Sequence, residues 1–443
     1  MPQAGVVHVR VQVFFIGAPK GFIDEVRNHL ESSFPGVSFN YSTLSNTNEA
    51  SASASQIPND TVGVIVFNFW SIPGIVRPIL TRGIPTLLVS ETYGGSGEFL
   101  MEYSRALRAN LPVYGIVLRD TSNLGYLDRY VRMFLTIGRL RDSKIVAIVG
   151  PDELNLMRLE YPLSVDLYSL PSYLQSIFGV KIALIDVREF NERYYGKVSD
   201  VDARPIAERW FKGAERVVDH TLDDLIKPAK LYLALRRLVE DYKADAVTID
   251  DIVLYNSGFL DTWPCLPFME LTLRDRVVSA CEGDLVSATL MLMMKYYANV
   301  PGFINDPAID MGKGEVVYFH CYAPVNARGF DSGELSPYVI TPAHGGGKKL
   351  SIHVRLPVNE AVTVLGLSPE ERILTIHTAK TTDNEYSLRA CATKLVAKAN
   401  VEALARNWVW RAGWHRVVFY GDWRNDVKVL ARFLKLNVIE EDA

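Results

Sequence analysis

The sequence predicts an α/β protein with two consecutive doubly wound parallel-sheet domains followed by a β-rich, barrel-like C-terminal domain. Up to Pro301, short β-branched runs alternate with helical patterns, which is typical of parallel sheets covered by helices. Beyond Pro301, strand patterns follow one another without long helices between them. The 443 residues also match three domains of roughly 150 residues each. We therefore expect domains at 1–142, 143–300 and 301–443.

The first expected domain contains four clear strands and two clear helices. The strands are Val9–Gly17, Val62–Phe69, Thr86–Ser90 and Val113–Leu118, and the helices are Phe22–Phe34 and Gly97–Arg108. Between them, Tyr41–Gln56 is rich in serine, asparagine and alanine, so we expect a loop or poorly ordered crossover there. The segment Glu91–Gly97 follows a strand and opens a helix, and its glycines favour a tight turn.

The second and third expected domains differ in how their strands are connected. In the second, the expected strands are Lys144–Gly150, Lys181–Asp186 and Ala246–Ile249, with helices at Asp202–Lys212, Asp224–Lys243 and Asp284–Tyr297. In the third, the expected strands are Glu315–Cys321, Leu350–Leu356, Ala361–Leu367, Arg372–Lys380 and His415–Tyr420, with late helices at Val401–Trp410 and Asn425–Lys435. Asp250 and Asp251 follow a strand, and we expect them to be solvated loop acids.

Composition narrows the classes of partner. Hydrophobic residues make up 48% and charged residues 22%, which is ordinary for a globular protein. The formal net charge of -4 and the lack of a dense basic run argue against nucleic acid and favour a small molecule. Met1–Gly17 lacks a positive start, and its apolar run is too short for a signal peptide or a membrane span, so we expect neither export nor a membrane.

The four cysteines indicate a reducing compartment. They are far apart and form no CxxC pair, which favours reduced core thiols over disulfides or a structural zinc site. We therefore expect a cytoplasmic protein.

Five short motifs in the second half of the chain share one order and spacing. They are Trp263-Pro264-Cys265, Ala280-Cys281-Glu282-Gly283-Asp284, Asn305-Asp306-Pro307, His320-Cys321, and Gly413-Trp414-His415 with Tyr420-Gly421-Asp422. Together they resemble the L-fucose isomerase and L-arabinose isomerase group, including its archaeal members. The resemblance covers Asp250 to the C-terminus, and before that it is one of domain order only.

The resemblance implies a metal-dependent aldose–ketose isomerase acting on a free sugar such as L-fucose or L-arabinose. Glu282, Asp306 and His415 match the metal ligands of that group, and Glu282 and Asp306 match its acid–base pair, which works through an enediolate. Manganese is the ion implied, with cobalt or magnesium as alternatives. Elementary chemistry agrees, because a hard cation among carboxylates polarises the two sugar oxygens of a carbonyl shift.

Each candidate also has an alternative without chemistry. Glu282 precedes an apolar helix and could stabilise its N-terminus, a role that Asp284 would fill equally well. Asp306 precedes a proline, as in many turns, and Asp310 is its rival as a ligand. A lone histidine at a strand edge, such as His415, is usually structural.

Three further residues are candidates for binding the sugar. Trp263 could stack on a sugar face or simply pack in the core. His320 could position a hydroxyl or hydrogen-bond within the β-rich domain. His344 lies in a glycine-rich loop that could approach the substrate or simply turn.

Two other functions stay open at this stage. Tandem α/β domains also build the clefts of non-catalytic sugar-binding or regulatory proteins. A metal-dependent epimerase or aldolase would use a similar enediolate. The resemblance also implies a homo-oligomer, a trimer or hexamer, in which the Glu91–Gly97 loop of one subunit reaches the site of another.

Overall fold

The computed structural model describes residues 9–151, 169–342, 349–387 and 389–443, and these form two compact units. Unit 1 comprises Met1–Arg139 with Asp426–Asn437, and unit 2 comprises Leu140–Asn425 with Val438–Ala443. Among the described residues, no helix is both long and apolar enough to cross a bilayer.

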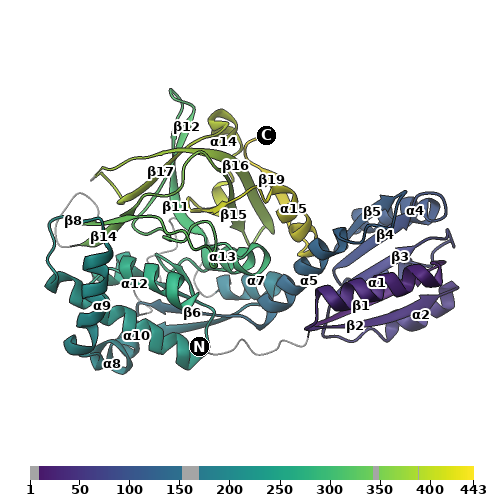
Figure 1. Ribbon diagram of the computed structural model, residues 1–443, viewed down its shortest axis with the longest axis horizontal. Helices are drawn as coiled ribbons and strands as arrows, with labels where there is room; N and C mark the ends of the chain where they lie inside the picture. Colours follow the sequence, from purple (N-terminus) through teal and green to yellow (C-terminus); the bar gives the residue numbers. More distant parts are fainter. Residues whose placement is uncertain (1–8, 152–168, 343–348, 388) are drawn as a thin grey trace. The chain divides into compact units, whose positions relative to one another are not determined.

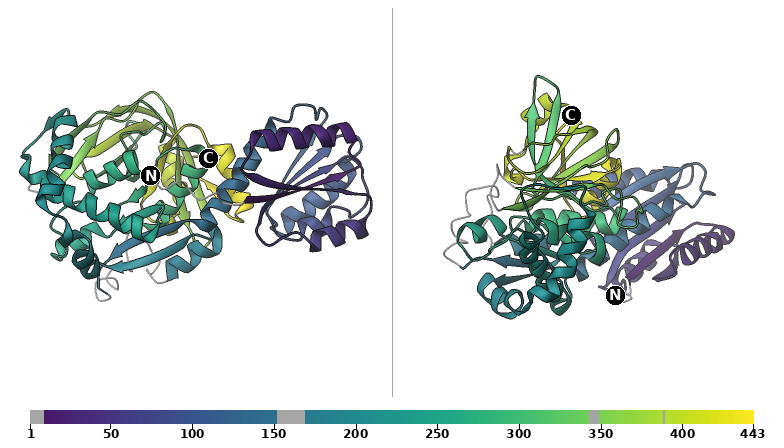
Figure 2. Two further views of the ribbon diagram at one scale, coloured as in Figure 1. Left: turned by 60° about the horizontal axis from the view of Figure 1, so that its bottom comes forward. Right: turned by 60° about the vertical axis from the view of Figure 1, so that its left-hand side comes forward.

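Unit 1 is built on one parallel sheet of five strands in the order β2-β1-β3-β4-β5, with helices on both of its faces (Figures 1 and 2). The strands are β1 (Val9–Ile16), β2 (Val37–Leu44), β3 (Thr61–Asn68), β4 (Thr86–Glu91) and β5 (Val113–Leu118). The helices are α1 (Lys20–Ser33), α2 (Thr47–Ser55), α3 (Arg77–Leu80), α4 (Ser96–Arg108), most of α5 (Tyr126–Asp142) and most of α15 (Arg424–Phe433). Strands β3 and β4 are buried nearly throughout, as expected when both faces of a parallel sheet are covered.

The expectation of a loop at Tyr41–Gln56 is wrong, because this stretch contains the end of β2 and the whole of α2. The side chain of Asn46 accepts a hydrogen bond from the backbone N–H of Glu49, and the Glu49 carboxylate accepts one from the backbone N–H of Ser45. This reciprocal capping satisfies helix-end donors. Ala50 and Ala54 then bury the inner face of the helix, so small residues serve here as close packing and not as a flexible linker.

Unit 2 contains a second parallel sheet, in the order β10-β9-β6-β7. Its strands are β6 (Lys144–Val149), β7 (Lys181–Asp186), β9 (Ala246–Ile249) and β10 (Val278–Ala280). The helices of this part are α7 (Ser169–Phe178), α8 (Val187–Arg193), α9 (Asp200–Gly213), α10 (Ile226–Tyr242), α11 (Asp251–Asn256), α12 (Cys265–Glu270) and α13 (Leu285–Ala298). Helix α13 is buried almost all round, which its apolar sequence predicts.

The second half of unit 2 is a closed antiparallel barrel of six strands. Their order is β15-β18-β11-β12-β17-β16, and pairing of β15 with β16 closes the ring, with β19 added beside β16 (Figure 1). The strands are β11 (Phe303–Asp310), β12 (Glu315–His320), β15 (Ala361–Ser368), β16 (Ile373–Asn384), β17 (Thr393–Lys398), β18 (Arg416–Tyr420) and β19 (Asn437–Glu440). Unit 2 also contains a small sheet of β8 (Arg216–Val217), β13 (Tyr338–Pro342) and β14 (Leu350–Val354), and helix α14 (Val401–Asn407).

The expected fold class is therefore confirmed at the level of an α/β chain with two parallel sheets and a C-terminal barrel. One hydrophobic core runs through unit 2, from Val146 and Ile148 of the sheet to Val418 and Tyr420 of the barrel. The boundary expected between 143–300 and 301–443 stays a prediction.

Candidate metal centre

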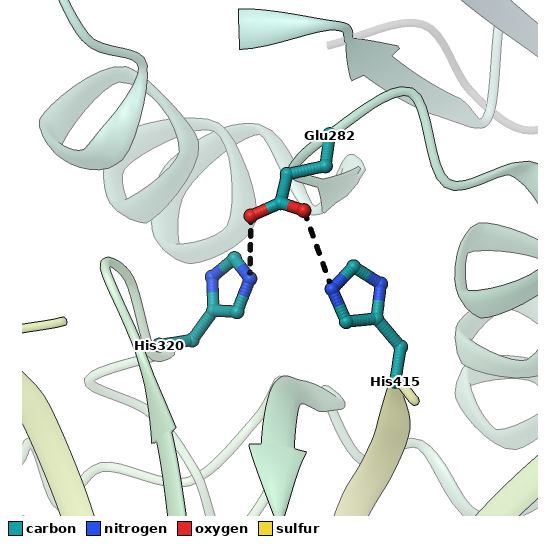
Figure 3. Close-up of side chains that lie close together, drawn as sticks. All are labelled: Glu282, His320 and His415. Atoms are coloured by element: carbon teal, nitrogen blue, oxygen red, sulfur yellow. Dashed lines mark ion pairs between the residues drawn. The ribbon is translucent and has the colours of Figure 1, made fainter. Parts of the chain in front are cut away.

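A carboxylate lies between two buried histidines in unit 2. Glu282 is in the turn between β10 and α13, His320 ends β12, and His415 directly precedes β18. The Glu282 Oε1 atom is 3.3 Å from His320 Nε2, and its Oε2 atom is 3.4 Å from His415 Nε2 (Figure 3). One donor atom from each of the three residues lies within 4.8 Å of the others, so three segments distant in sequence converge on one point.

Asp306 adds a second carboxylate to this group. It lies within β11, where its Oδ1 atom is 3.4 Å from His415 Nε2. Its rival Asp310 ends the same strand and accepts a hydrogen bond from the backbone N–H of Lys313 at 3.0 Å, as an acid at the start of a turn does. The structure thus places Glu282 and Asp306 next to His415, and His320 next to Glu282. Their role as metal ligands stays a prediction.

The turn that carries Glu282 has a strained backbone. Glu282 has a φ of 60° and Gly283 a φ of 65°, both in the left-handed region. That region costs a residue with a side chain about 1–2 kcal/mol, so other contacts must hold it. The Asp251 carboxylate accepts the N–H of Glu282 at 2.7 Å, and the carbonyl of Ile249 accepts the N–H of Gly283 at 2.7 Å. The end of β9 therefore fixes this turn.

The expectation that Asp250 and Asp251 are solvated is wrong, because both are buried. They follow β9, and Asp251 contacts the turn after β10 through the backbone N–H of Glu282. Burial, together with the nearby negative charge of Glu282, raises the pKa of Asp251 to about 7.

His415 is oriented by a carboxylate on its far side. Its Nδ1 atom is 2.9 Å from Asp284 Oδ2, and Asp284 is the N-cap of α13, accepting bonds from the backbone N–H and the hydroxyl of Ser287 at 2.8 and 2.6 Å. Asp284, and not Glu282, is therefore the helix cap. A proton on Nδ1 leaves the Nε2 lone pair directed at Glu282 and Asp306.

Trp414 contacts two of the segments that form the site. Its indole N–H donates to the carbonyl oxygen of Pro307 at 3.0 Å, and its ring meets that of Phe319 edge-on with centroids 6.0 Å apart. Pro307 follows Asp306, and Phe319 precedes His320. The Gly-Trp-His motif thus fixes the spacing of three candidate ligands.

The charges of the site are strongly coupled. Burial disfavours the ionised carboxylate of Glu282, but hydrogen bonding and positive charge from His320 and His415 prevail and hold its pKa well below the ordinary value. Burial would lower the pKa of His320, yet Glu282 raises it to about 9. Burial would also lower the pKa of His415, but Asp284 and Glu282 hold it well above the ordinary value. Burial raises the pKa of Asp306.

The donor set fits a hard divalent cation. Two carboxylates and two imidazoles suit manganese, cobalt or zinc, and the oxygen share also suits magnesium. Donors at neighbouring corners of an octahedron with bonds of about 2.1 Å are about 3 Å apart. Glu282 lies 3.3 and 3.4 Å from His320 and His415, slightly above that value, so small side-chain movements would bring these three donors to one ion. Asp306 lies beside this group, 3.4 Å from His415 Nε2.

The other predicted site residues lie elsewhere or outside the described residues. Trp263 is buried, with its ring centroid 5.7 Å from that of Tyr255 and the Lys349 ammonium 5.4 Å from its ring centre. Its contact with a sugar stays a prediction. His344 lies outside the described residues. In unit 1, the Glu91 carboxylate accepts the N–H groups of Tyr93 and Gly94, so Glu91–Gly97 forms a tight turn.

Comparison with known proteins gives one curated relative. The chain is 26% identical over 279 residues to the sulfoquinovose isomerase of Clostridium sp. (strain MSTE9), and the aligned part covers 60% of each protein. The chain thus spans 60% of the length of that relative. No protein-family model matches the chain. The sequence is therefore similar to a sugar isomerase.

Proposed function

We propose that this protein is a divalent-metal-dependent aldose–ketose isomerase whose ion is held by Glu282, Asp306, His320 and His415. The observation that supports it most is the Glu282 carboxylate between two buried imidazoles, with Asp306 beside one of them. A buried set of this kind costs desolvation free energy, and a bound cation would offset that cost. Manganese is the ion we propose, as in the L-fucose isomerase and L-arabinose isomerase group that the motifs resemble.

The reaction moves protons and leaves the sugar's heavy atoms in place. One proton goes from C2 to C1, and a hydroxyl proton goes from O2 to O1, through an enediolate of the sugar. A bound cation would supply Lewis-acid polarisation of the carbonyl. Glu282 is held ionised, whereas burial raises the pKa of Asp306, and two carboxyls displaced in opposite directions suit an acid–base pair.

The proposed substrate is a free monosaccharide. The relative is named for sulfoquinovose, so a sulfonated hexose belongs in the first panel beside L-fucose, L-arabinose and other L- and D-aldoses. Chelator-treated protein would receive Mn²⁺, and ketose formation would be followed for each sugar.

Two variants control this assay. Glu282→Gln keeps the shape of the side chain but loses its charge and basicity, and we expect turnover to fall by at least about 10³-fold with the fold intact. Glu371→Gln removes a carboxylate from an ion pair with Arg411 and should leave turnover unchanged. An active Glu282→Gln enzyme would exclude the mechanism. An epimer or a cleaved sugar as product would indicate an epimerase or aldolase, and Mn²⁺ binding without turnover would favour a sugar-binding protein.

A further inference from the structure

A fully buried ion pair lies inside the barrel, directly behind the candidate metal centre. Arg416 on β18 donates to Glu441 through Nη2 at 2.6 Å and Nε at 3.2 Å, and neither residue is exposed to solvent. The guanidinium carbon also lies 3.7 Å from the ring centre of Trp408. Burying two charges is costly, and an apolar pair of similar volume is often as stable. Packing alone therefore does not account for this pair.

The pair contacts the backbone that carries His415. Arg416 donates through Nη1 to the carbonyl oxygens of His415 at 2.9 Å and Gly413 at 3.1 Å. Asn305 on β11 donates through Nδ2 to the carbonyl oxygen of Arg416 at 3.0 Å. Consecutive strand residues point to opposite faces, so Asn305 and Arg416 point into the barrel while their neighbours Asp306 and His415 point the other way. Asp306 and His415, two of the candidate metal ligands, are therefore each followed or preceded in the sequence by a buried polar residue.

The same network reaches the strand of His320. Glu441 Oε2 is 3.3 Å from His377 Nδ1, and His377 Nε2 is 2.9 Å from the hydroxyl of Tyr318. Tyr318 precedes His320 by two residues on β12, so both side chains are on the same face of the strand. Burial would raise the pKa of Glu441, but Arg416 and His377 hold it at about 2. Its negative charge therefore persists across neutral pH.

We infer that Arg416 and Glu441 are positioning residues that set the register of the β11, β12 and β18 backbones and so place Asp306, His320 and His415 for the ion. This inference rests on the metal site proposed above. Neither residue contacts the site through its own side chain. Arg416 acts on the main chain around His415, whereas Glu441 acts through Arg416 and, by way of His377, on the Tyr318 side chain of β12.

The test is Mn²⁺ affinity, measured by titration calorimetry and by the electron paramagnetic resonance spectrum of the bound ion in the full-length protein. Loss of a partner that orients metal ligands typically lowers affinity by about 10–100-fold. We expect a loss of that size in Glu441→Gln and in the double variant Arg416→Met with Glu441→Met. The double variant leaves no unpaired buried charge, so its fold should persist where the single change lowers stability.

A matched control is Glu270→Gln elsewhere in unit 2. Glu270 is also buried and pairs with Arg209, Arg274 and the Trp210 indole. None of these three residues lies on β11, β12 or β18. Glu270→Gln should lower the melting temperature without changing Mn²⁺ affinity at a temperature where all variants are folded.

Unchanged affinity and spectrum in both Glu441 variants would overturn the inference. So would an equal loss in Glu270→Gln, because the effect would then be general destabilisation. If both Glu441 variants failed to fold while Glu270→Gln folded, the pair would be a folding element and not a positioning one. A wild-type protein that binds no Mn²⁺ would instead contradict the proposed metal site, before any variant is compared.

Discussion

The surroundings of His415 and of His320 differ, although both histidines are buried and both face Glu282. His415 has a carboxylate on Nδ1 that also caps α13, and it lies 3.4 Å from both Glu282 and Asp306. His320 Nδ1 has no hydrogen-bond partner among the residues that the structure describes. The rotation and tautomer of His415 are thus fixed by the protein, whereas those of His320 depend on Glu282 and packing. One half of the centre is preorganised, and the other adjusts.

The largest expected effect compares the two imidazoles directly. His415→Ala should lower Mn²⁺ affinity by more than about 100-fold, because it removes a candidate ligand that faces both carboxylates. This loss is larger than the one typical of a residue that only orients a ligand. His320→Ala should cost less. Calorimetric titration of both variants measures the difference, with His29→Ala in unit 1 as a histidine control. An equal or larger loss in His320→Ala would contradict the asymmetry.

A smaller effect is expected from the carboxylate behind His415. Asparagine caps helices about as well as aspartate, so Asp284→Asn should keep the melting temperature of the metal-free protein close to that of the wild type. It removes the negative charge that orients His415, and we expect Mn²⁺ affinity to fall by about 10-fold. Thermal melts and titration measure the two quantities separately. Unchanged Mn²⁺ affinity in Asp284→Asn would contradict the orienting role and leave Asp284 as a helix cap only.

The smallest effect, at most about tenfold over one pH unit, is a pH dependence that separates the histidines. Metal binding needs neutral imidazole, and in the metal-free protein Glu282 raises the pKa of His320 to about 9. Protons therefore compete at His320 below pH 9, and competition weakens as the pH rises. We expect Mn²⁺ affinity to increase by at most about tenfold per pH unit from this histidine, levelling off near pH 9. Titrations at several pH values should show this component in the wild type, and its persistence in His320→Ala would assign it to another group.

Sequence alone predicted much of the secondary structure and three of the four candidate ligands. The strand and helix rhythm predicted four of the five strands of the first parallel sheet, three of the four of the second and four of the six barrel strands, but not β2, β10, β11 or β17. The resemblance carried by the motifs selected Glu282, Asp306 and His415, and the structure places both carboxylates 3.4 Å from His415. His320 was considered only as a sugar-binding or structural residue. A signal for a closer role was present, because Val316, Tyr318 and His320 alternate on the buried face of a strand next to the one that carries Asp306.

Other features could not be predicted from local pattern. Asn46 and Glu49 cap the start of α2, but the small polar residues of this helix lack the apolar periodicity that would have indicated it in the sequence. The pairing of Arg416 with Glu441 depends on barrel closure, which no short-range periodicity encodes. The burial of Asp251 likewise depends on the turn after β10 folding over the end of β9.

The place of β18 in the barrel couples closure of the barrel to completion of this site. Of the six barrel strands, β18 is the last along the chain, yet it lies between β15 and β11. Until it inserts, those two strands have unpaired edges, and an open edge of this kind invites pairing with another chain. Insertion of β18 closes the barrel and delivers His415 to Glu282 in the same event. A molecule in which β18 has not yet paired therefore has both an exposed strand edge and an incomplete candidate metal centre. Strand pairs between segments distant in sequence form slowly during folding. Metal that binds only the closed barrel would then stabilise the folded state relative to these open forms.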